Sequence, residues 1–236
     1  MQAKQAFVRN RLEQMIGTRF QVGDKLPSEP DMARELEVSR ETFRAAVKLL
    51  EQEGKLRVKH GVGTFVVRPL PTIPSPLEKL FSIGSMIRSA RLEEGESRMA
   101  LREEGCPPET AKALGLAPGD PVIVLERIRT ANGEPVAFSV NTLPKSLVGN
   151  LFSEADFSGS LLSYFKNKLG HKLVTVDSEI AVPLPTDRYV QQLVMNPNST
   201  VLLMKQLHYD EGNRPLLYSL DYLRNDVFTF HIRRTL

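Results

Sequence analysis

The chain has 236 residues, of which 41% are hydrophobic and 25% are charged, and its formal net charge is +3. This composition excludes a disordered chain, and no stretch approaches the roughly 20 apolar residues that cross a bilayer, so we expect no membrane partner. The only cysteine, Cys106, cannot form an internal disulfide, which fits a reducing compartment and predicts a cytoplasmic protein.

The first third of the chain predicts three helices. Residues 2–17 carry apolar side chains at helical spacing. Ser28 and Ser39 are candidate N-caps of two further short helices, because a serine hydroxyl can accept a hydrogen bond from a backbone N–H of the first turn. The buried stripe of the third helix is predicted from its i, i+3, i+4 and i+7 spacing to be Phe43, Ala46, Val47 and Leu50.

A row of cations occupies another face of the third predicted helix. Arg40, Arg44 and Lys48 stand at i, i+4 and i+8. The following residues 55–59 alternate basic and apolar side chains, which is typical of a half-buried strand whose cations point outward. Glycines at 61 and 63 predict the tip of a two-stranded wing. Such a helix can enter the DNA major groove while the wing contacts the backbone or minor groove.

Cations at helical spacing are often only a solvated face, so this alternative must be weighed. The uneven distribution of charge favours DNA. Residues 1–68 contain 13 Lys and Arg against 9 Asp and Glu, whereas residues 69–236 contain 18 against 19. The net positive charge therefore belongs to the first third of the chain, as phosphate binding requires.

Two motifs of this region resemble a known family. LPSEPDMARELEVSRETFRAAVKLLEQEG and HGVGTFV are similar to the winged-helix domain of the GntR family of bacterial transcription regulators, over most of residues 5–67. In that family the start of the recognition helix and the wing tip contact the operator. Carried over to this sequence, the resemblance implicates Ser39, Arg40, Thr42, Arg44, His60 and Gly61. Pro30 stands where the family often has a DNA-contacting arginine, so one contact is expected to be absent.

The clearest domain boundary is a proline-rich segment. Prolines at 69, 71, 74 and 76 exclude a helix and predict a semi-rigid linker over residues 69–76. We therefore expect a DNA-binding domain at 1–68 and a second domain at 77–236. The second domain alternates strand-like runs and short helices, including a helix over 160–169 and a helix at 186–195 capped by Thr186. The pattern predicts an α+β fold with a mostly antiparallel sheet.

Two arginines are the strongest chemical signal in the second domain. Arg127 and Arg129 are two residues apart on a predicted strand and share a face with apolar residues. Such a pair either reaches the solvated rim of the sheet or holds a carboxylate or phosphate. The hairpin at Asn132-Gly133 leaves two registers open. A two-residue turn pairs Arg127 with Phe138, whereas a three-residue loop pairs it with Ser139, and we favour the latter.

The motifs ERIRTANGEPVAF, NTLPKSL, GSLLSYF and DEGNRPLLYSLDYLRNDVFTF resemble the effector-binding UTRA domain of the HutC branch of the GntR family, over roughly residues 75–236. The resemblance implies a chorismate-lyase-like fold that binds small molecules between sheet and helices. It implies that Arg127, Arg129 and Ser160 hold an anionic group, and that a loop with Ser82 and Ser85 closes over it.

The sequence departs from members of that branch that bind amino-sugar phosphates. Ser139 stands where those members tend to have a glutamate, and they often have another glutamate near Leu217 and a tyrosine near Leu162. We therefore expect a less polar effector with an acidic head. Its anionic end would meet the arginines and its apolar body would meet Leu162, Phe138 and Leu217. Tyr164 and Asp221 are further candidates, for each of which a structural role is the alternative.

No metal-ligand spacing, phosphate-binding loop or nucleophile motif is present, so no cofactor and no catalysis are expected. The sequence predicts a ligand-responsive transcription regulator, most simply a repressor that binds a palindromic operator as a homodimer and is controlled by a small anionic effector. Two alternatives remain: a lyase-like enzyme carrying a DNA-binding head, and an architectural DNA-binding protein without an effector.

Overall fold

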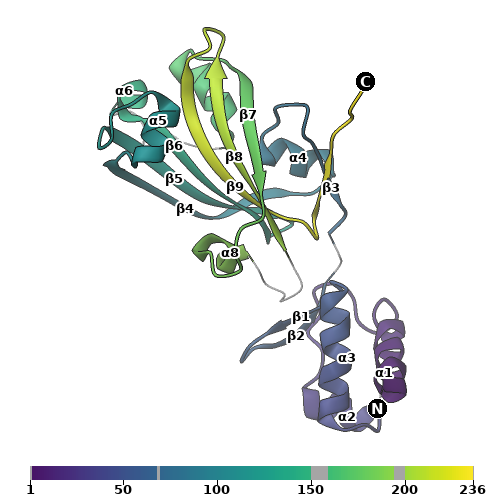
Figure 1. Ribbon diagram of the computed structural model, residues 1–236. Coiled ribbons are helices and arrows are strands. Elements are labelled where there is room, and N and C mark those ends of the chain that lie inside the picture. Colours follow the sequence, from purple (N-terminus) through teal and green to yellow (C-terminus); the bar gives the residue numbers. More distant parts are fainter. Residues whose placement is uncertain (1, 68–69, 150–158, 194–199, 236) are drawn as a thin grey trace. The chain divides into compact units, whose positions relative to one another are not determined.

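The computed structural model describes residues 2–67, 70–149, 159–193 and 200–235, and the chain divides into two compact units, Met1–Leu70 and Pro71–Leu236 (Figure 1). The first unit contains three helices and a two-stranded sheet: α1 (Gln2–Met15), α2 (Glu29–Glu35), α3 (Arg40–Gln52), β1 (Leu56–Lys59) and β2 (Gly63–Val66). Together these elements form a winged helix-turn-helix, as the sequence predicts.

Local signals position the helices of the first unit. Ser28 Oγ accepts a hydrogen bond from the backbone N–H of Asp31 at 3.4 Å, and Ser39 Oγ accepts one from Thr42 at 3.2 Å. Both predicted caps are therefore confirmed. The stripe that α3 buries is also the predicted one, and it packs with α1 into a single core. The buried residues of α3 are Phe43, Ala46, Val47 and Leu50.

The wing differs from its predicted alternation. Leu56 is buried, but Val58 is 45% exposed, because β1 pairs only with β2 in a two-stranded sheet. Lys55 does not point into solvent either, since its ammonium forms ion pairs with Glu13 and with Glu53, the latter at 2.8 Å. The expectation that every cation of this segment faces outward is wrong at Lys55.

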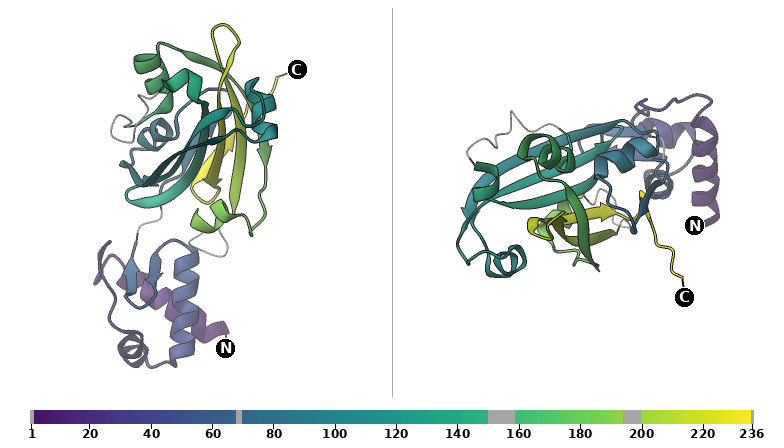
Figure 2. Two further views of the ribbon diagram at one scale, coloured as in Figure 1. Left: turned by 90° about the vertical axis from the view of Figure 1, so that its left-hand side faces the viewer. Right: turned by 90° about the horizontal axis from the view of Figure 1, so that it is seen from above.

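The second unit is built on a six-stranded antiparallel sheet in the order β4-β5-β6-β9-β8-β7. Helices lie on both sides of this curved sheet (Figure 2). The strands are β4 (Glu94–Gly105), β5 (Pro121–Ala131), β6 (Glu134–Pro144), β7 (Leu173–Ala181), β8 (Val201–Asp210) and β9 (Pro215–Arg224). The helices are α4 (Ile83–Ser89), α5 (Pro108–Leu114), α6 (Lys145–Val148), α7 (Leu161–Tyr164), which continues into a π-helical turn (Phe165–Leu169), and α8 (Arg188–Leu193).

Part of the expected linker is a strand. Residues of β3 (Ile73–Pro76) pair in parallel with β10 (Phe228–His231), and Ile73 is fully buried. Proline is compatible with a strand whose other edge is unpaired, so the proline-rich segment belongs largely to the second unit. A second correction concerns α8, which begins later than predicted: Asp187, rather than Thr186, accepts a hydrogen bond from the backbone N–H of Tyr189 at 2.8 Å.

The hairpin between β5 and β6 determines which side chains face the same side of the sheet. Asn132 and Gly133 have φ values of +50° and +77°, as a tight two-residue turn requires, and Ala131 pairs with Glu134. A β-bulge follows, because the register shifts between Arg129 and Thr130. Arg127 is therefore opposite Ser139, as predicted, but the cause is a bulge and not a three-residue loop.

Candidate DNA-binding surface and effector cavity

The start of α3 carries four of the residues implicated in DNA binding. Arg40 and Arg44 are exposed on this helix, and Phe43 between them is buried in the core. The hydroxyl groups of Ser39 and Thr42 are 2.8 Å apart, so they are partly occupied with each other as part of the helix cap. The geometry leaves both guanidinium groups accessible from outside the unit, as a groove-binding helix requires.

Arg44 is held by a partner from the preceding helix. Its Nε donates to Glu29 Oε2 at 2.9 Å, and its side chain is 70% exposed. An ion pair this exposed contributes at most about 1 kcal/mol, so a phosphate or a base edge can compete with Glu29 for the guanidinium. Glu29 therefore orients Arg44 without sequestering it.

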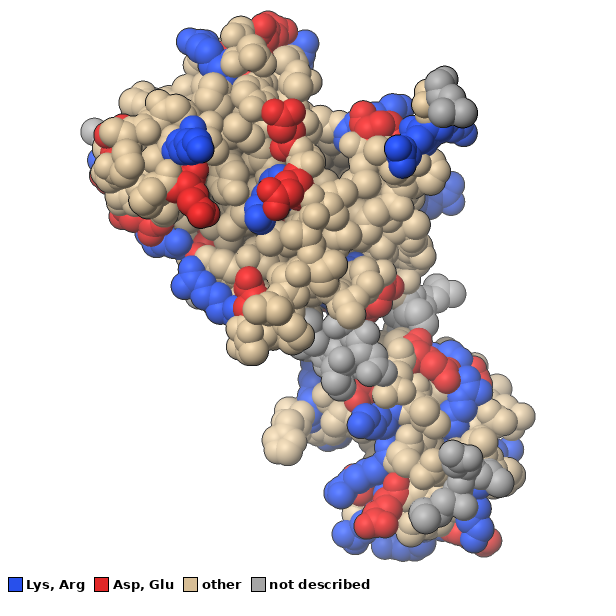
Figure 3. All heavy atoms as spheres, in the orientation of Figure 1, with Lys and Arg blue, Asp and Glu red and all other residues tan. Residues whose placement is uncertain are grey.

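The wing tip is also exposed. His60 and Gly61 lie between β1 and β2, and Gly61 has a φ of +72°, which favours glycine. The Lys59 ammonium lies 5.1 Å from the centre of the Phe65 ring on the opposite strand. Lysines and arginines are interspersed with acidic side chains over this unit (Figure 3), so binding to phosphate depends on local clusters of cations more than on a uniformly positive surface.

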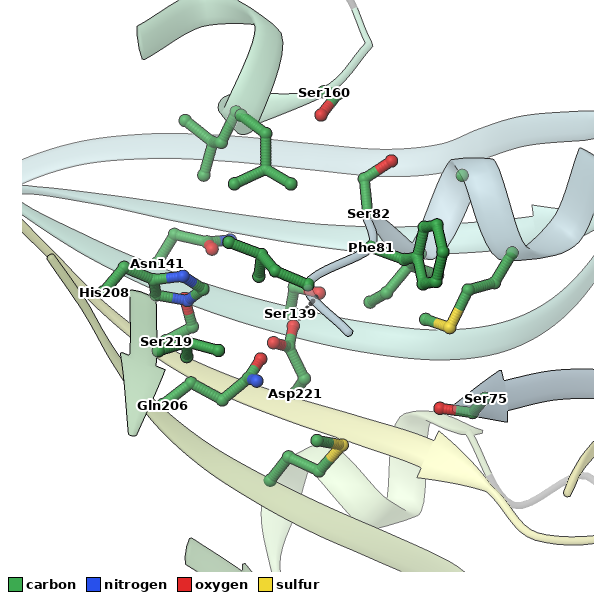
Figure 4. A pocket seen from close by; sticks show the side chains of 18 of the residues that line it. Ser75, Phe81, Ser82, Ser139, Asn141, Ser160, Gln206, His208, Ser219 and Asp221 are labelled. Atoms are coloured by element: carbon green, nitrogen blue, oxygen red, sulfur yellow. Dashed lines mark hydrogen bonds between the residues drawn. The ribbon is translucent and has the colours of Figure 1, made fainter. Parts of the chain in front are cut away.

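The second unit contains a cavity between the sheet and the segments that lead into α4 and α7 (Figure 4). Its volume of about 100 Å³ accommodates roughly seven to ten water-sized groups, which suits a small molecule. Side chains that share one face of β5, β6, β7, β8 and β9 form its floor. Most of the residues expected to contact an effector line this cavity: Ser82, Arg127, Arg129, Ser139, Ser160, Leu162 and Leu217.

Arg127 and Arg129 are only 7% and 5% exposed, so they are not solvated rim residues. Arg127 donates to the carbonyl oxygen of Gly159 at 2.7 Å, and Arg129 donates to the same oxygen at 3.3 Å and to Glu96 at 3.1 Å. Arg129 also pairs with Glu94. Burial lowers the pKa of Arg127, although the nearby carboxylates oppose this effect. The arginine end of the cavity is therefore a desolvated cationic site that is partly compensated by glutamates.

Two serines border the cavity at helix starts. Ser82 is the N-cap of α4, where its Oγ accepts a hydrogen bond from the backbone N–H of Ser85 at 3.1 Å. Ser160 precedes α7 and makes no side-chain capping hydrogen bond. The Ser160 hydroxyl is therefore not committed to the cap of its own helix.

Two expected effector contacts are corrected by the structure. Phe138 is fully buried in the core on the opposite face of the sheet, where its ring lies 4.8 Å from that of Tyr189. The bulge after Arg129 causes this, because it turns Ser139 toward the cavity and Phe138 away. Tyr164 packs in a second core cluster with Leu161 and Phe165, one turn beyond the cavity-lining start of α7.

Several polar cavity residues were not among the predicted site residues. They come from β6, β8 and β9 and are Asn141, Gln206, His208 and Ser219 (Figure 4). Asp221, a weaker candidate from the sequence, also lines the cavity. The signal that could have identified them is alternation, since Asn141 shares a face with Ser139, and Ser219 and Asp221 share one with Leu217. Recognising this required the strand order, which the sequence does not state.

Asp221 lies in the centre of the cavity floor. Ser139 Oγ donates to its Oδ1 at 2.5 Å. Burial raises the pKa of Asp221 to about 6, although the Ser139 hydrogen bond and the charge of Arg127 act in the opposite direction. Burial lowers the pKa of His208 to about 4, so this ring is neutral at physiological pH. Burial therefore favours the uncharged form of both side chains, which is protonated Asp221 and deprotonated His208.

We predict that replacing Asp221 with asparagine changes the pH dependence of stability. The folded-state pKa of Asp221 exceeds its unfolded value, so its contribution to stability is fully present below pH 4 and is lost as pH rises through 6. Between pH 5 and pH 8 the wild type should lose about 1.4 kcal/mol that Asp221→Asn does not lose. Urea unfolding followed by circular dichroism measures this, with the exposed Asp177→Asn on β7 as the matched control. The prediction would be contradicted if the free energy of unfolding changed equally with pH in the wild type and in Asp221→Asn.

Among the described residues, no group of three His, Cys, Asp or Glu side chains is arranged to hold a metal ion. In the same part of the chain, no helix combines the length and the apolar character needed to cross a bilayer. Cys106 is buried, and its pKa is raised by burial first and by Asp120 and Glu104 next. The thiol is therefore poorly suited to reactivity.

Comparison with known proteins finds a matching family model for each of the two units. Residues 4–66 match the model of bacterial regulatory proteins of the gntR family, and residues 97–229 match the UTRA domain. The HTH-type transcriptional repressor PhnF of Mycolicibacterium smegmatis is 29% identical over 230 residues, covering 96% of this chain and 91% of PhnF. The HTH-type transcriptional repressor NagR of Bacillus subtilis is 26% identical over 205 residues, covering 87% of this chain and 83% of NagR.

Solved structures show the same architecture. The crystal structure of PhnF from Mycobacterium smegmatis superposes with a TM-score of 0.64 at 27% identity, covering 97% of this chain and 99% of PhnF. The matched families and these relatives are DNA-binding transcription regulators rather than enzymes. The match covers nearly the whole of both chains, so this chain shares with PhnF the arrangement of a winged helix followed by a second, α+β domain. The chain belongs to the GntR family of bacterial transcription regulators, in the group whose second domain is a UTRA domain.

Proposed function

We propose that this regulator is a repressor that binds a palindromic operator as a homodimer and responds to a small anionic effector. The observation that carries the effector is the burial of Arg127 and Arg129 at the end of a small cavity. Buried guanidinium groups need anionic partners, and their planar donor groups suit carboxylate and phosphate. Glu94 and Glu96 meet part of this need.

The contacts of the arginines suggest how an effector would act. Both guanidinium groups donate to the carbonyl oxygen of Gly159, immediately before Ser160 and α7. An anion at this position competes with that carbonyl, because both are acceptors for the same N–H groups. Effector binding would then shift the start of α7. A shift of this kind regulates DNA binding only if the effector prefers one of two arrangements of the protein.

The edge strand β7 supports a dimer. It lies at the end of the sheet, and apolar side chains are exposed on it and after it, with Ile180 48% and Val182 80% exposed. Charged side chains are sparse over much of the face that carries β7, β8 and β9 (Figure 3). Exposed apolar edge strands are typical of surfaces that another chain covers. Two copies joined here would present two recognition helices to a two-fold symmetric operator.

Gel-shift titration tests this proposal with DNA from upstream of the protein's own gene. Wild type should retain the fragment, deletion of one half-site should abolish retention, and some phosphate monoesters or carboxylates should release it. Arg127→Gln should retain DNA equally but resist release, because Arg129 still neutralises the glutamates while the anion site is weakened. Retention that no small acid changes would favour an effector-free architectural protein. Release of Arg127→Gln by the same acids would refute the arginine site.

A further inference from the structure

Uncharged polar side chains cross the floor of the cavity next to the arginine end. Asn141 on β6 is in register with Ser219 on β9, Ser219 with Gln206 on β8, and Gln206 with Ser178 on β7. All four line the cavity, since cross-strand partners share one face of a sheet. We call Asn141, Ser219, Gln206 and Ser178 the polar row.

A histidine with incomplete hydrogen bonding adjoins the polar row (Figure 4). His208 is 4% exposed and lines the cavity, and its Nε2 lies 3.1 Å from Ser219 Oγ. Within the described part of the chain its Nδ1 has no hydrogen-bond partner. Buried polar atoms are normally satisfied, so an unpaired ring nitrogen in the wall of a cavity points to a hydrogen-bonding occupant.

His208 and the side chains of the polar row are neutral and together offer both donors and acceptors. His208 is uncharged at neutral pH because burial disfavours its protonated form. Gln206 Nε2 donates to Ser178 Oγ at 3.0 Å, so its amide oxygen can accept from an occupant. The Asn141 amide reaches the carbonyl oxygen of Leu125 only at 3.5 Å, which is a weak hydrogen bond. A hydroxyl group, which donates and accepts at once, matches this environment better than a second charge.

We infer that the polar row and His208 form a second subsite, which binds an uncharged hydroxyl group of the same effector whose anionic group binds at Arg127 and Arg129. The inference rests on the proposed function, because it takes the arginine end as the anion site. Arg127 is in register with Ser139 and Asp221, two residues along the strands from the polar row. Two residues of strand span about 7 Å, and Asn141, the first member of the polar row, lies on the strand next to that of Arg127, about 4.8 Å away across the sheet. The effector is therefore a small organic anion with a hydroxyl group about 7 to 9 Å from its charge.

Two matched pairs of compounds test the subsite: 3-hydroxypropyl phosphate against propyl phosphate, and 5-hydroxypentanoate against pentanoate. By isothermal titration calorimetry with the full chain, the hydroxylated member of at least one pair should bind at least about tenfold more tightly than its partner. Gln206→Met and Asn141→Leu remove hydrogen-bonding groups at similar volume. Each should reduce the preference to less than about twofold without weakening the unsubstituted compound. Met204→Leu, on the same face of β8, is the control and should retain the preference.

The outcomes separate this inference from the proposed function. Equal affinities within both pairs, together with loss of binding in Arg127→Gln, would overturn the second subsite and leave the anion site intact. A preference that survives both Gln206→Met and Asn141→Leu would also overturn it. Binding that Arg127→Gln does not weaken, or no binding by any of the four compounds at millimolar concentration, would overturn the anion site and the inference with it.

Discussion

Replacing Arg40 and Arg44 together with alanine is expected to weaken operator binding by about 2 to 6 kcal/mol, which is at least about 30-fold. Both side chains are exposed near the start of α3, where a recognition helix approaches base edges and phosphates. The slope of log affinity against log salt should also decrease by about 2 if both arginines contact phosphates. Fluorescence anisotropy with labelled operator at several salt concentrations measures both quantities.

The matched control is Arg11→Ala on α1, which removes one exposed positive charge from a different helix of the same unit. It should change operator affinity by less than about threefold, because only long-range electrostatics are lost. Effector binding should be unchanged in all of these variants. If the double variant binds the operator as wild type does, α3 is not the recognition helix, and the cationic stripe is only a solvated face.

The second large effect is expected in stability. Arg129→Ala should lower the free energy of unfolding by about 2 kcal/mol, because it removes a buried cation and leaves Glu94 and Glu96 with Arg88 and Arg127 as their remaining partners in the described part of the chain. Arg129 is 5% exposed and pairs with both Glu94 and Glu96. Burial already raises the pKa of Glu96, so this carboxylate depends on its neighbouring cations. Urea unfolding at pH 7 measures the loss.

Two further variants define the cause. Arg102→Ala on β4 removes an arginine whose pairs with Glu104 and Glu126 are more exposed, and it should cost less than about 1 kcal/mol. Adding Glu94→Gln and Glu96→Gln to Arg129→Ala should recover a large part of the stability, because the side chains that lost their partner are then neutral. An Arg129→Ala loss no greater than that of Arg102→Ala would show that water solvates the glutamates.

Features of the fold that depend on nearby residues could be predicted from the sequence. The caps Ser28 and Ser39 act within three residues, and the buried stripe of α3 follows from helical spacing. Thr186 was wrong because Asp187, one residue further along, is an equally good capping residue and sequence alone does not choose between them. Segments 150–158 and 194–199, which include the end of the predicted helix 186–195, lie outside the described residues.

The site was harder to predict because its composition depends on register and on strand order. One unpaired residue in the hairpin decides whether Phe138 or Ser139 faces Arg127, and hydrophobicity does not reveal the bulge. The polar row unites residues of four strands whose order in the sheet, β6-β9-β8-β7, differs from their order in the chain. None of its residues stands out in the sequence as a binding residue. The expectation of an apolar effector body therefore rested on Leu162 and Leu217 alone and did not take into account the polar side chains that line the same cavity.

The pairing of β3 with β10 has a consequence for biosynthesis. β3 follows directly after the first unit, whereas its partner strand Phe228–His231 is synthesised only after all six strands of the large sheet. The winged helix, whose contacts are local, can fold while translation continues. Ser75 on β3 lines the cavity, so this wall of the cavity is not held in place until β10 has been synthesised. A nascent chain could therefore acquire its DNA-binding head before it can sense a metabolite.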